Sequence, residues 1–548
     1  MTSPPPSGTV AGMTQDSHGT HDGVGTVRLN RRRPAPPAGL SQVRETALVI
    51  DCGSSSVRAF IAEITDEHAR ILEDMVHPVD LTAGFTGGKL DRVAMDLVVQ
   101  AVCGIIIVAK GYGVTRIRAV ATSALREANN SDVLVERLRT TCSVDLDVID
   151  GSEAVRLYFE ALRRTLNEDR RTLQGNTLLM DIGAGCTSAG LIRQGKLVYS
   201  VDEHYGTVRL SDAFQELRDS LDYSVTIDRF STGAARMMLS RLPSRTVSTL
   251  VFTGGEVRRL VTLTGNETGG IIETLEPEAL ERLWTELAPL SPAKRAERCC
   301  LPVYDAARIL PALALIRHLI ELSGADKILV PQMTLRDGML ADLLPGAQGA
   351  HHLEPEHVLA EAKQLVSRYG GDLPYAENTA QLAVQLFDQT VELHNLGARE
   401  RLLLEFAAVV HDIGSYINVR NRHKHTMYII QSADIAGLTR PEQDIVANVA
   451  RYHRKSPPEP HHQDFMALPR RARVTVAYLA AILRLAYALD VERSQRIKKV
   501  RCVVDGERLL LHVDRRQIAL ERWSLAGKIQ LFREVFGLDV VIIPRGEF

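Results

Sequence analysis

Short apolar runs alternate with longer amphipathic segments between Thr46 and Glu160. The apolar runs ALVIDCG, AFIAEI, IRAVATSA and DLDVID have the length and composition of buried strands. Between them, Asp91–Lys110 and Asp132–Thr140 show the spacing of apolar residues that is typical of helices. This alternation predicts an α/β fold in which helices cover a sheet.

A second set of the same elements begins with TLLMDIGAGCTSAGLI at 177–192. It repeats the order of the first set, which is an apolar strand, an aspartate, a turn of small residues and another apolar run. A later strand, STLVFTGGE at 248–256, also ends in a glycine turn. Two similar sets of elements predict a duplicated α/β core.

The remainder of the chain changes character after HHLEP at 351–355, where long amphipathic helices begin. It ends in the strand-like runs VRCVVDG, LLLHV and LDVVII, with a helix between the last two. We therefore predict α/β half-domains at 44–175 and 176–345, an all-α domain at 355–498 and a small α+β domain at 499–548.

Composition excludes several classes of protein. The 65 Lys and Arg residues nearly balance the 67 Asp and Glu residues, so no overall charge favours a nucleic-acid or membrane partner. No uninterrupted apolar run reaches membrane-spanning length. The seven cysteines include no C-x-x-C pair, which favours reduced thiols in the cytoplasm over disulfides or a zinc site. Residues 1–43, rich in Pro, Gly, Ser and Thr, predict a disordered tail and lack the apolar centre of a signal peptide.

The run VIDCGSSSVR at 49–58 ends a strand in an acid and then turns through glycine and three serines. Such a turn can hold phosphate oxygens with N–H and hydroxyl groups, while the aspartate holds a cation or its waters. One copy alone is weak, because ordinary tight turns use the same residues. Asp181 with the turn 183–187 is a second copy, and the turn after Thr253 would be a third. Two such turns facing one cleft would clamp a phosphate, a layout that resembles the actin-like architecture of sugar kinases and Hsp70 ATPases.

Longer motifs resemble a narrower family. ATSALREANNSDVLVERL (121–138), VIDGSEAVRLYFEAL (148–162), DIGAGCT (181–187), GTVRL (206–210) and the run 306–344 are similar, in order and spacing, to the Ppx/GppA phosphatases. HDIG at 411–414, HKHTMYIIQSADIAGL at 423–438 and RYHRK at 451–455 resemble the HD-like third domain of the longer members. Those enzymes are exopolyphosphatases and guanosine pentaphosphate phosphohydrolases.

The resemblance implies hydrolysis of a terminal phosphoanhydride by water, with Mg²⁺ neutralising phosphate charge and a glutamate as general base. It implies a cytoplasmic homodimer whose partner molecules are inorganic polyphosphate or a guanosine polyphosphate. Asp51 and Asp181 match the acids near the metal. The phosphate-binding candidates of the three turns are Gly53, Ser54, Ser55, Ser56, Gly183, Ala184, Gly185, Cys186, Thr187, Gly254 and Gly255. Thr122, Ser123 and Arg126 match a family segment that borders the cleft, and Arg58 lies just beyond the first turn. Either arginine would bind phosphate oxygens or form a surface ion pair.

Several positions depart from the family pattern. The family carries two adjacent glutamates between the glycine and arginine matched by Gly151 and Arg156, and the second is usually assigned as the base. Here the pair is Glu153 and Ala154, which leaves Glu153 as the candidate base or as a charge in the first turn of a helix. The second turn ends in Ser188, where the family carries glutamate, and the first has Ser55 where asparagine is usual.

The helical domain departs as well. An HD phosphohydrolase binds metal through an upstream histidine, a His-Asp pair and a late aspartate. His411, Asp412 and Asp490 fit this set, but Asn378 stands at the upstream position, which argues against an independent metal site. We expect His423, His425 and His453 at the surface or an interface of the helices.

Three functions remain open from sequence. The motif series favours an exopolyphosphatase or pentaphosphate phosphohydrolase that uses Mg²⁺. The changes at Ala154, Ser188 and Asn378 leave a weakened relative that binds polyphosphate or (p)ppGpp as a regulator. The fold alone would also allow an actin-like kinase or ATPase.

Overall fold

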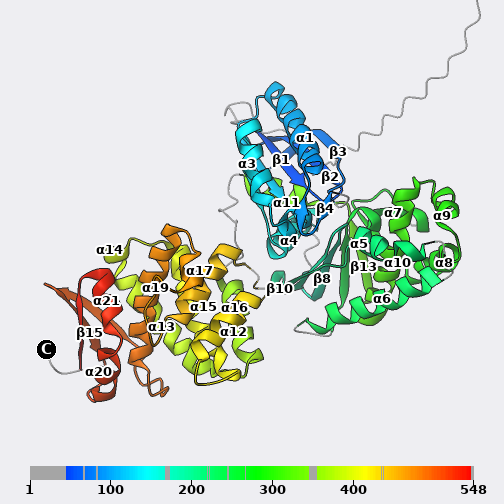
Figure 1. The fold of residues 1–548 in the computed structure, drawn as a ribbon. Coiled ribbons are helices and arrows are strands. Elements are labelled where there is room, and N and C mark those ends of the chain that lie inside the picture. The colour runs from blue at the N-terminus through cyan, green and yellow to red at the C-terminus, as the bar shows by residue number, and fades with distance from the viewer. Residues whose placement is uncertain are drawn as a thin grey trace, which may run out of the picture. The chain divides into compact units, whose positions relative to one another are not determined.

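The computed structural model describes residues 45–65, 68–81, 84–166, 173–218, 220, 222–242, 246–265, 267–344, 355–433, 435 and 437–544. The predicted disordered tail at 1–43 lies outside these residues. The described chain forms a five-stranded sheet, a six-stranded sheet, a helical region followed by a three-stranded sheet, and a small two-stranded ribbon (Figure 1).

The first sheet has the strand order β3-β2-β1-β6-β7. Its first three strands are antiparallel neighbours, and β6 and β7 continue parallel to β1. The elements of this part of the chain are β1 (Glu45–Cys52), β2 (Ser56–Ile64), β3 (Ala69–Pro78), β4 (Phe85–Thr86), β5 (Lys89–Leu90), α1 (Arg92–Gly111), β6 (Arg116–Ala121), α2 (Ser123–Glu127), α3 (Ser131–Cys142), β7 (Leu146–Val148) and α4 (Gly151–Leu166).

The second sheet has the order β10-β9-β8-β11-β13-β12. Its first five strands repeat the pairing of the first sheet, with β8 in the place of β1 and β12 added at the edge. The predicted duplication is thus present in the strand order. The elements are β8 (Asn176–Ile182), β9 (Thr187–Arg193), β10 (Lys196–Glu203), α5 (Thr207–Ala213), η2 (Gln215–Leu217), α6 (Asp222–Ser240), β11 (Thr249–Thr253), α7 (Gly255–Thr264), β12 (Ile272–Thr274), α8 (Pro277–Leu287), α9 (Pro292–Cys299), α10 (Val303–Ser323), β13 (Lys327–Pro331) and α11 (Leu335–Leu343).

Each sheet is buried on both faces, which explains why its central strands are continuously apolar. In β1, Leu48 and Ile50 pack with α1 and α3, whereas Ala47 and Val49 pack with α4 and α11. In the second sheet, α6 and α10 cover one face, as Figure 1 shows. Val155 of α4 packs in a cluster with Leu179 of β8, so α4 has apolar contacts with both sheets.

Helix α11 corrects the predicted boundary between the half-domains. The prediction placed residues up to 345 in the second half-domain, but α11 packs on the first sheet beside β1 and Phe60. Arg336 of α11 donates to the carbonyl of Ala59 at 3.2 Å, and its guanidinium carbon lies 3.7 Å from the centre of the Phe60 ring. The chain therefore returns to the first half-domain before it enters the helical region.

A disulfide joins α1 and α3, which lie beside each other in Figure 1. Cys103 and Cys142 have Cα atoms 5.5 Å apart, within the range that a disulfide can bridge. The expectation that all seven cysteines are reduced thiols is therefore wrong for this pair. The two residues are separated by 39 positions, so only the packing of the helices brings them together.

The helical region contains α12 (Pro355–Arg368), α13 (Leu373–Gln389), α14 (Val391–His394), α15 (Ala398–Val410), η3 (Ile413–Tyr416), α16 (Arg422–Ser432), α17 (Arg440–Arg451), α18 (Gln463–Met466) and α19 (Arg470–Leu489). The three-stranded sheet that follows, in the order β14-β15-β16, comprises β14 (Val500–Asp505), β15 (Arg508–Val513) and β16 (Asp539–Ile543), with α20 (Ala519–Ala526) and α21 (Ile529–Phe536). Gln385 and Gln389 of α13 bond the backbone of residues 498–502, so this sheet is attached directly to the helices.

Two helices in the described part of the chain are long and apolar enough to cross a membrane, judged by length and composition alone. They are α1 and α19, with mean hydropathies of 2.0 and 1.5, and the bent pair α9 and α10 would be a third if it counted as one span. Neither helix is an uninterrupted apolar run in the sequence. Within the fold, 50% of the α1 window and 72% of the α19 window is buried.

Candidate active site

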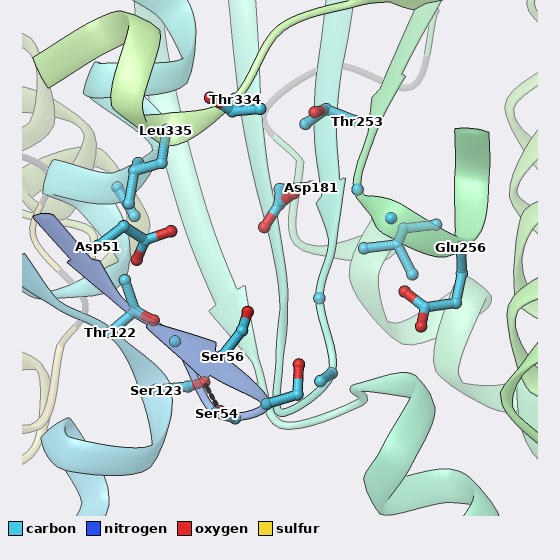
Figure 2. Close-up of a pocket in the computed structure, with 18 of the residues that line it drawn as sticks. Asp51, Ser54, Ser56, Thr122, Ser123, Asp181, Thr253, Glu256, Thr334 and Leu335 are labelled. Atoms are coloured by element: carbon cyan, nitrogen blue, oxygen red, sulfur yellow. Dashed lines mark hydrogen bonds between the residues drawn. The ribbon is translucent and has the colours of Figure 1, made fainter. Parts of the chain in front are cut away.

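A cleft of about 480 Å³ lies where β1 and β8 end. Asp51 of β1 pairs in register with Val120 of the parallel strand β6, and Asp181 of β8 pairs with Thr253 of β11. Both aspartates are therefore at the carboxyl ends of parallel strands, the usual place for a ligand site in an α/β sheet. Figure 2 shows their carboxyl groups directed into the same space from the two half-domains.

Burial changes the acidity of both aspartates. It raises the pKa of the Asp51 carboxyl, an effect that Arg58 and Arg336 oppose. Burial also raises the pKa of Asp181 to about 7, although the Tyr158 hydroxyl donates a hydrogen bond to it. Asp51 Oδ1 is buried and has no hydrogen-bond partner among the described residues. A buried carboxylate oxygen without a partner costs free energy that a bound cation would recover.

The first two turns have the same backbone geometry. Gly53 N–H donates to the carbonyl of Ser56 at 3.0 Å, and Gly183 N–H donates to the carbonyl of Cys186 at 3.0 Å. Ala184 is not among the described residues with positive φ, so an L side chain fits this turn without strain. The substitution of glycine by alanine at 184 therefore leaves the predicted phosphate turn intact.

The turns approach each other closely. The Ser54 and Ser123 hydroxyls lie 2.9 Å apart, and Figure 2 draws this bond across the floor of the site. A Cβ atom on Gly185 would lie 2.6 Å from Ser123 Oγ, so only glycine fits there without a shift. Gly206 is equally constrained, because its Cβ would lie 2.2 Å from the Ala184 carbonyl oxygen.

The third turn leads into α7. Gly254 has a φ of 126°, which glycine adopts readily, and a Cβ there would lie 2.4 Å from the carbonyl oxygen of Ile182. The free N–H groups at the start of this ten-residue helix are next to the cleft, where they would favour an anion.

Arginines outnumber acids on the wall of the cleft. The lining contains six arginines and three carboxylates: Arg58, Arg126, Arg258, Arg259, Arg308 and Arg336, against Asp51, Asp181 and Glu256. Burial lowers the pKa of Arg258, and the nearby charge of Arg58 lowers it further. Two guanidinium groups that repel each other in a buried cleft are stabilised by an anion between them.

Other arginines have structural partners. Arg336 forms an ion pair with Asp74 at 2.5 Å, and the guanidinium carbon of Arg308 lies 4.1 Å from the centre of the Tyr304 ring. These contacts fix the two side chains at the edge of the cleft.

All but three of the predicted site residues line this cleft. Gly185 and Thr187 lie behind its surface, where Thr187 is fully buried and its hydroxyl donates to the carbonyl of Tyr205 at 2.8 Å. Glu153 is the third exception. Its oxygens accept from Arg156 at 2.7 and 2.8 Å and from Arg118 at 3.2 Å, and Ala154 lines the cleft instead. This geometry does not support the prediction that Glu153 activates the attacking water.

Sequence reasoning missed several lining residues. Arg258 and Arg259 follow the third turn within five residues, so the run GGEVRR could have indicated them. Tyr158 and Ser188 lie in motifs that were noted for other residues. Arg308 and Arg336 come from distant helices, α10 and α11, and carry no local signal.

The helical region contains a second cluster of polar residues. The ligand atoms of His411, Asp412 and His453 lie within 4.8 Å of one another. Asp412 is paired with Arg422 at 2.5 Å and with Arg493 at 2.5 Å, so both charges compete with a cation for it. His453 is fully buried, so of its two predicted places, the surface or an interface of the helices, the surface is excluded.

His423 and Asn378 lie in the same helical region. His423 is only 6% exposed, which likewise excludes the surface and leaves the predicted interface of the helices. At the upstream ligand position, the Asn378 amide donates to Asp490 Oδ2 at 2.8 Å. The asparagine therefore bonds the late aspartate directly.

Comparison with known proteins gives two family matches. A family model described as the Ppx/GppA phosphatase family matches residues 60–347, which is more than half of the chain. A model described as Ppx/GppA phosphatase, domain III, matches residues 360–527. This second match includes both the helical region and part of the three-stranded sheet, across the boundary predicted at residue 498.

Curated relatives cover most of the chain. A protein of Aeromonas hydrophila subsp. hydrophila named guanosine-5'-triphosphate,3'-diphosphate pyrophosphatase is 25% identical over 470 residues, with 81% of this chain and 88% of that protein covered. A protein of Vibrio parahaemolyticus with the same name is 24% identical over 477 residues, with 85% and 91% covered.

Solved structures resemble a little over half of the chain. A Ppx/GppA family member from Aquifex aeolicus is 22% identical, with 55% of this chain and 97% of that chain covered and a TM-score of 0.48. An exopolyphosphatase from Cytophaga hutchinsonii is 21% identical, with 56% and 99% covered and a TM-score of 0.48.

Proposed function

The chain belongs to the Ppx/GppA phosphatase family, and we propose that its cleft hydrolyses the terminal phosphoanhydride bond of inorganic polyphosphate or guanosine pentaphosphate. The observation that carries this proposal is the meeting of Asp51 and Asp181 with six arginines in one cleft. Two carboxylates suit a cation, and the arginines suit the oxygens of a phosphate chain.

The residues of the cleft bind and orient the phosphate. The N–H groups and hydroxyls of the first two turns hold the terminal phosphate from both half-domains, as the matching bonds at Gly53 and Gly183 support. Arg58 and Arg258 bind its oxygens and so relieve their mutual repulsion. Phosphoryl transfer depends mainly on such positioning and charge stabilisation. Water then attacks phosphorus, and the bond to the bridging oxygen breaks.

We propose Mg²⁺ as the cofactor. The donor set fits a hard cation, because Asp51 Oδ1 is a buried carboxylate oxygen without a hydrogen-bond partner in the described chain and Asp181 lies in the same cleft. When bound, Mg²⁺ neutralises phosphate charge. The raised pKa of Asp181, about 7, means that a cation must displace a proton from part of the population at neutral pH.

The two substrates come from different relatives. Both curated relatives described above are named as pyrophosphatases of guanosine-5'-triphosphate,3'-diphosphate, and the relative from Cytophaga hutchinsonii is named as an exopolyphosphatase. These names favour hydrolysis over the alternative of a regulator that binds polyphosphate or (p)ppGpp without turnover. Ala154 in the cleft is the feature that keeps the alternative worth testing.

The helical region is proposed to be HD-like but not a second hydrolase. The two arginines on Asp412 and the bond between Asn378 and Asp490 occupy the groups that an HD site would use for metal. The expected catalytic centre is therefore the α/β cleft alone.

Phosphate release tests the proposal. The purified protein is given long-chain polyphosphate and guanosine pentaphosphate separately, with Mg²⁺ or with EDTA. We expect turnover that requires Mg²⁺, a loss of at least 10²-fold in Asp51→Asn, and no change in Asp145→Asn, an exposed acid of the same half-domain. Tight binding of either substrate without turnover would overturn hydrolysis in favour of the regulator.

A further inference from the structure

Three polar residues form a row across the second sheet. Ser188 of β9 is paired in register with Asp181 of β8 on one side and with Asp202 of β10 on the other. Residues directly opposite in neighbouring strands project from the same face of a sheet, with Cβ atoms about 4.5–5.5 Å apart. The row therefore leads from Asp181 in the cleft to a carboxylate two strands away.

Direct contacts connect this carboxylate to the cleft. The Ser188 hydroxyl lines the cleft and donates to Asp202 Oδ1 at 2.5 Å. Asp202 Oδ2 forms an ion pair with Arg126, which lines the cleft as well. The Asp202 side chain is 17% exposed, so most of it is shielded from solvent by these partners.

The start of α4 leaves room for Asp202. A Cβ atom on Gly151 would lie 2.3 Å from the Cβ atom of Asp202, so glycine at 151 lets the helix and the carboxylate approach. Ala154 lies one turn later in this helix and lines the cleft. Asp202 thus contacts Ser188 directly and lies against Gly151, three residues before Ala154. Positions 154 and 188 are the two at which the chain lacks the glutamates of the family pattern.

We propose that Asp202 is a positioning residue that acts through Ser188 on the attacking water, in place of those two glutamates. A hydroxyl that donates to a carboxylate keeps its lone pairs free to accept a hydrogen bond from water. This inference rests on the proposed function.

The proton follows that hydrogen bond. As the water oxygen forms its bond to phosphorus and the bridging P–O bond breaks, one water proton passes to Ser188 Oγ and the serine proton passes to Asp202 Oδ1. The shortened phosphate chain leaves as the anion. Asp202 then releases its proton to solvent.

The test compares kcat and KM for the substrate that is turned over. Asp202→Asn should lower kcat by about 10²-fold, the contribution typical of a positioned base, while KM changes less than about threefold. Ser188→Ala should give a similar loss, and the double variant should lose no more than either single variant, because the two residues form one path. Ser188→Glu combined with Asp202→Asn should recover at least tenfold of the lost kcat.

Glu203→Gln is the matched control, since Glu203 is the next residue of β10 and pairs with Arg241 instead. We expect its kcat to equal that of the unaltered protein. Thermal melts of all variants separate a loss of folding from a loss of chemistry, and Ser188→Ala removes only one oxygen from the fold.

The outcomes separate this inference from the function on which it rests. No turnover by the unaltered protein would overturn both. Unchanged kcat in Asp202→Asn would overturn this inference alone. So would a raised KM in Asp202→Asn with normal kcat in Ser188→Ala, because Asp202 would then act only by holding Arg126.

Discussion

Glu153 and Arg156 lie one turn apart in α4 and form an ion pair, with Arg156 Nε 2.7 Å from Glu153 Oε2. Arg156 also reaches Asp342 at 2.5 Å, and Arg118 bonds both acids. The Arg156 and Asp342 side chains are each only 4% exposed. The network therefore joins α4, β6 and α11 and holds Glu153 away from the cleft.

Glu153→Gln should weaken folding more than catalysis. The substitution leaves Arg118 and Arg156 with Asp342 as the remaining acid of the network. We therefore expect the free energy of unfolding to fall by about 2–3 kcal/mol. The kcat per folded molecule should stay within about twofold, since Ala154 and not Glu153 lines the cleft. Chemical denaturation and phosphate release measure the two effects.

Glu136→Gln is the control for this change. Glu136 and Arg139 have the same spacing in α3 but are both 58% exposed, so the free energy of unfolding should not change in this control. A collapse of kcat in Glu153→Gln with normal stability would instead restore Glu153 as the base.

Arg258→Gln should weaken substrate binding at little cost to the fold. Arg258 is half-buried and donates to the carbonyl of Met333 at 3.3 Å, but Arg58 repels it, so the loss of that hydrogen bond is partly offset in the empty protein. With substrate bound, a charged hydrogen bond is lost, and we expect KM to rise about 10- to 100-fold. Steady-state kinetics in Arg258→Gln and in the exposed control Arg282→Gln measure this. An unchanged KM would place the phosphate elsewhere.

Glu361 in α12 should make the protein less stable as the pH rises. Burial raises the pKa of its carboxyl from 4.5 to about 8, and Arg368 offsets this only in part. Between these pH values the folded state holds a proton that the unfolded state has lost. The free energy of unfolding therefore falls as the pH rises from about 4.5 to 8, and the loss is complete above pH 8.

Glu361→Gln should remove this dependence. We expect the free energy of unfolding of the variant to exceed that of the unaltered protein by roughly 2–4 kcal/mol at pH 8.5. At pH 4.5 the two proteins should be equally stable. Urea denaturation at the two pH values tests it, with Glu356→Gln, a control in the same helix with an 81% exposed side chain. Equal stability at pH 8.5 would show that the carboxyl ionises without penalty.

How much of this site the sequence predicts depends on how local each feature is. Asp51 and Asp181 could be identified because each belongs to a short local motif, in which an apolar strand is followed by an acid and a turn of small residues. The structure places both aspartates in one cleft. The orientation of Glu153 was not predictable by counting, because residues 153 and 154 differ by about 100° around the helix axis. Which of them faces the cleft depends on where α4 packs.

Features built by distant segments were missed for a related reason. The disulfide of Cys103 and the position of Arg336 in the cleft each require two elements far apart in the chain to pack together. The pattern of apolar residues within one element does not show which distant element will pack against it. The boundary placed at residue 345 failed similarly, since α11 follows the second half-domain in sequence and packs on the first.

That return of α11 gives a final prediction, at Gly338. A Cβ atom on this residue would lie 2.0 Å from the carbonyl oxygen of Leu157. Helices α11 and α4 are therefore in direct backbone contact at this point, and a rotamer change cannot relieve the clash. Gly338→Ala must push the two helices apart. We expect it to lower the free energy of unfolding by about 2–3 kcal/mol, as for overpacked cores.

The same change should impair the cleft, because α11 holds Leu335 and Arg336 at its wall. Gly104→Ala in α1 is the matched control, since a Cβ there meets nothing within 4 Å. In that helix interior alanine should stabilise by about 0.5–1 kcal/mol. Denaturation curves and kcat of both variants test the close packing of α11 on α4. If Gly338→Ala is as stable and as active as Gly104→Ala, the two helices do not pack as closely as the structure places them.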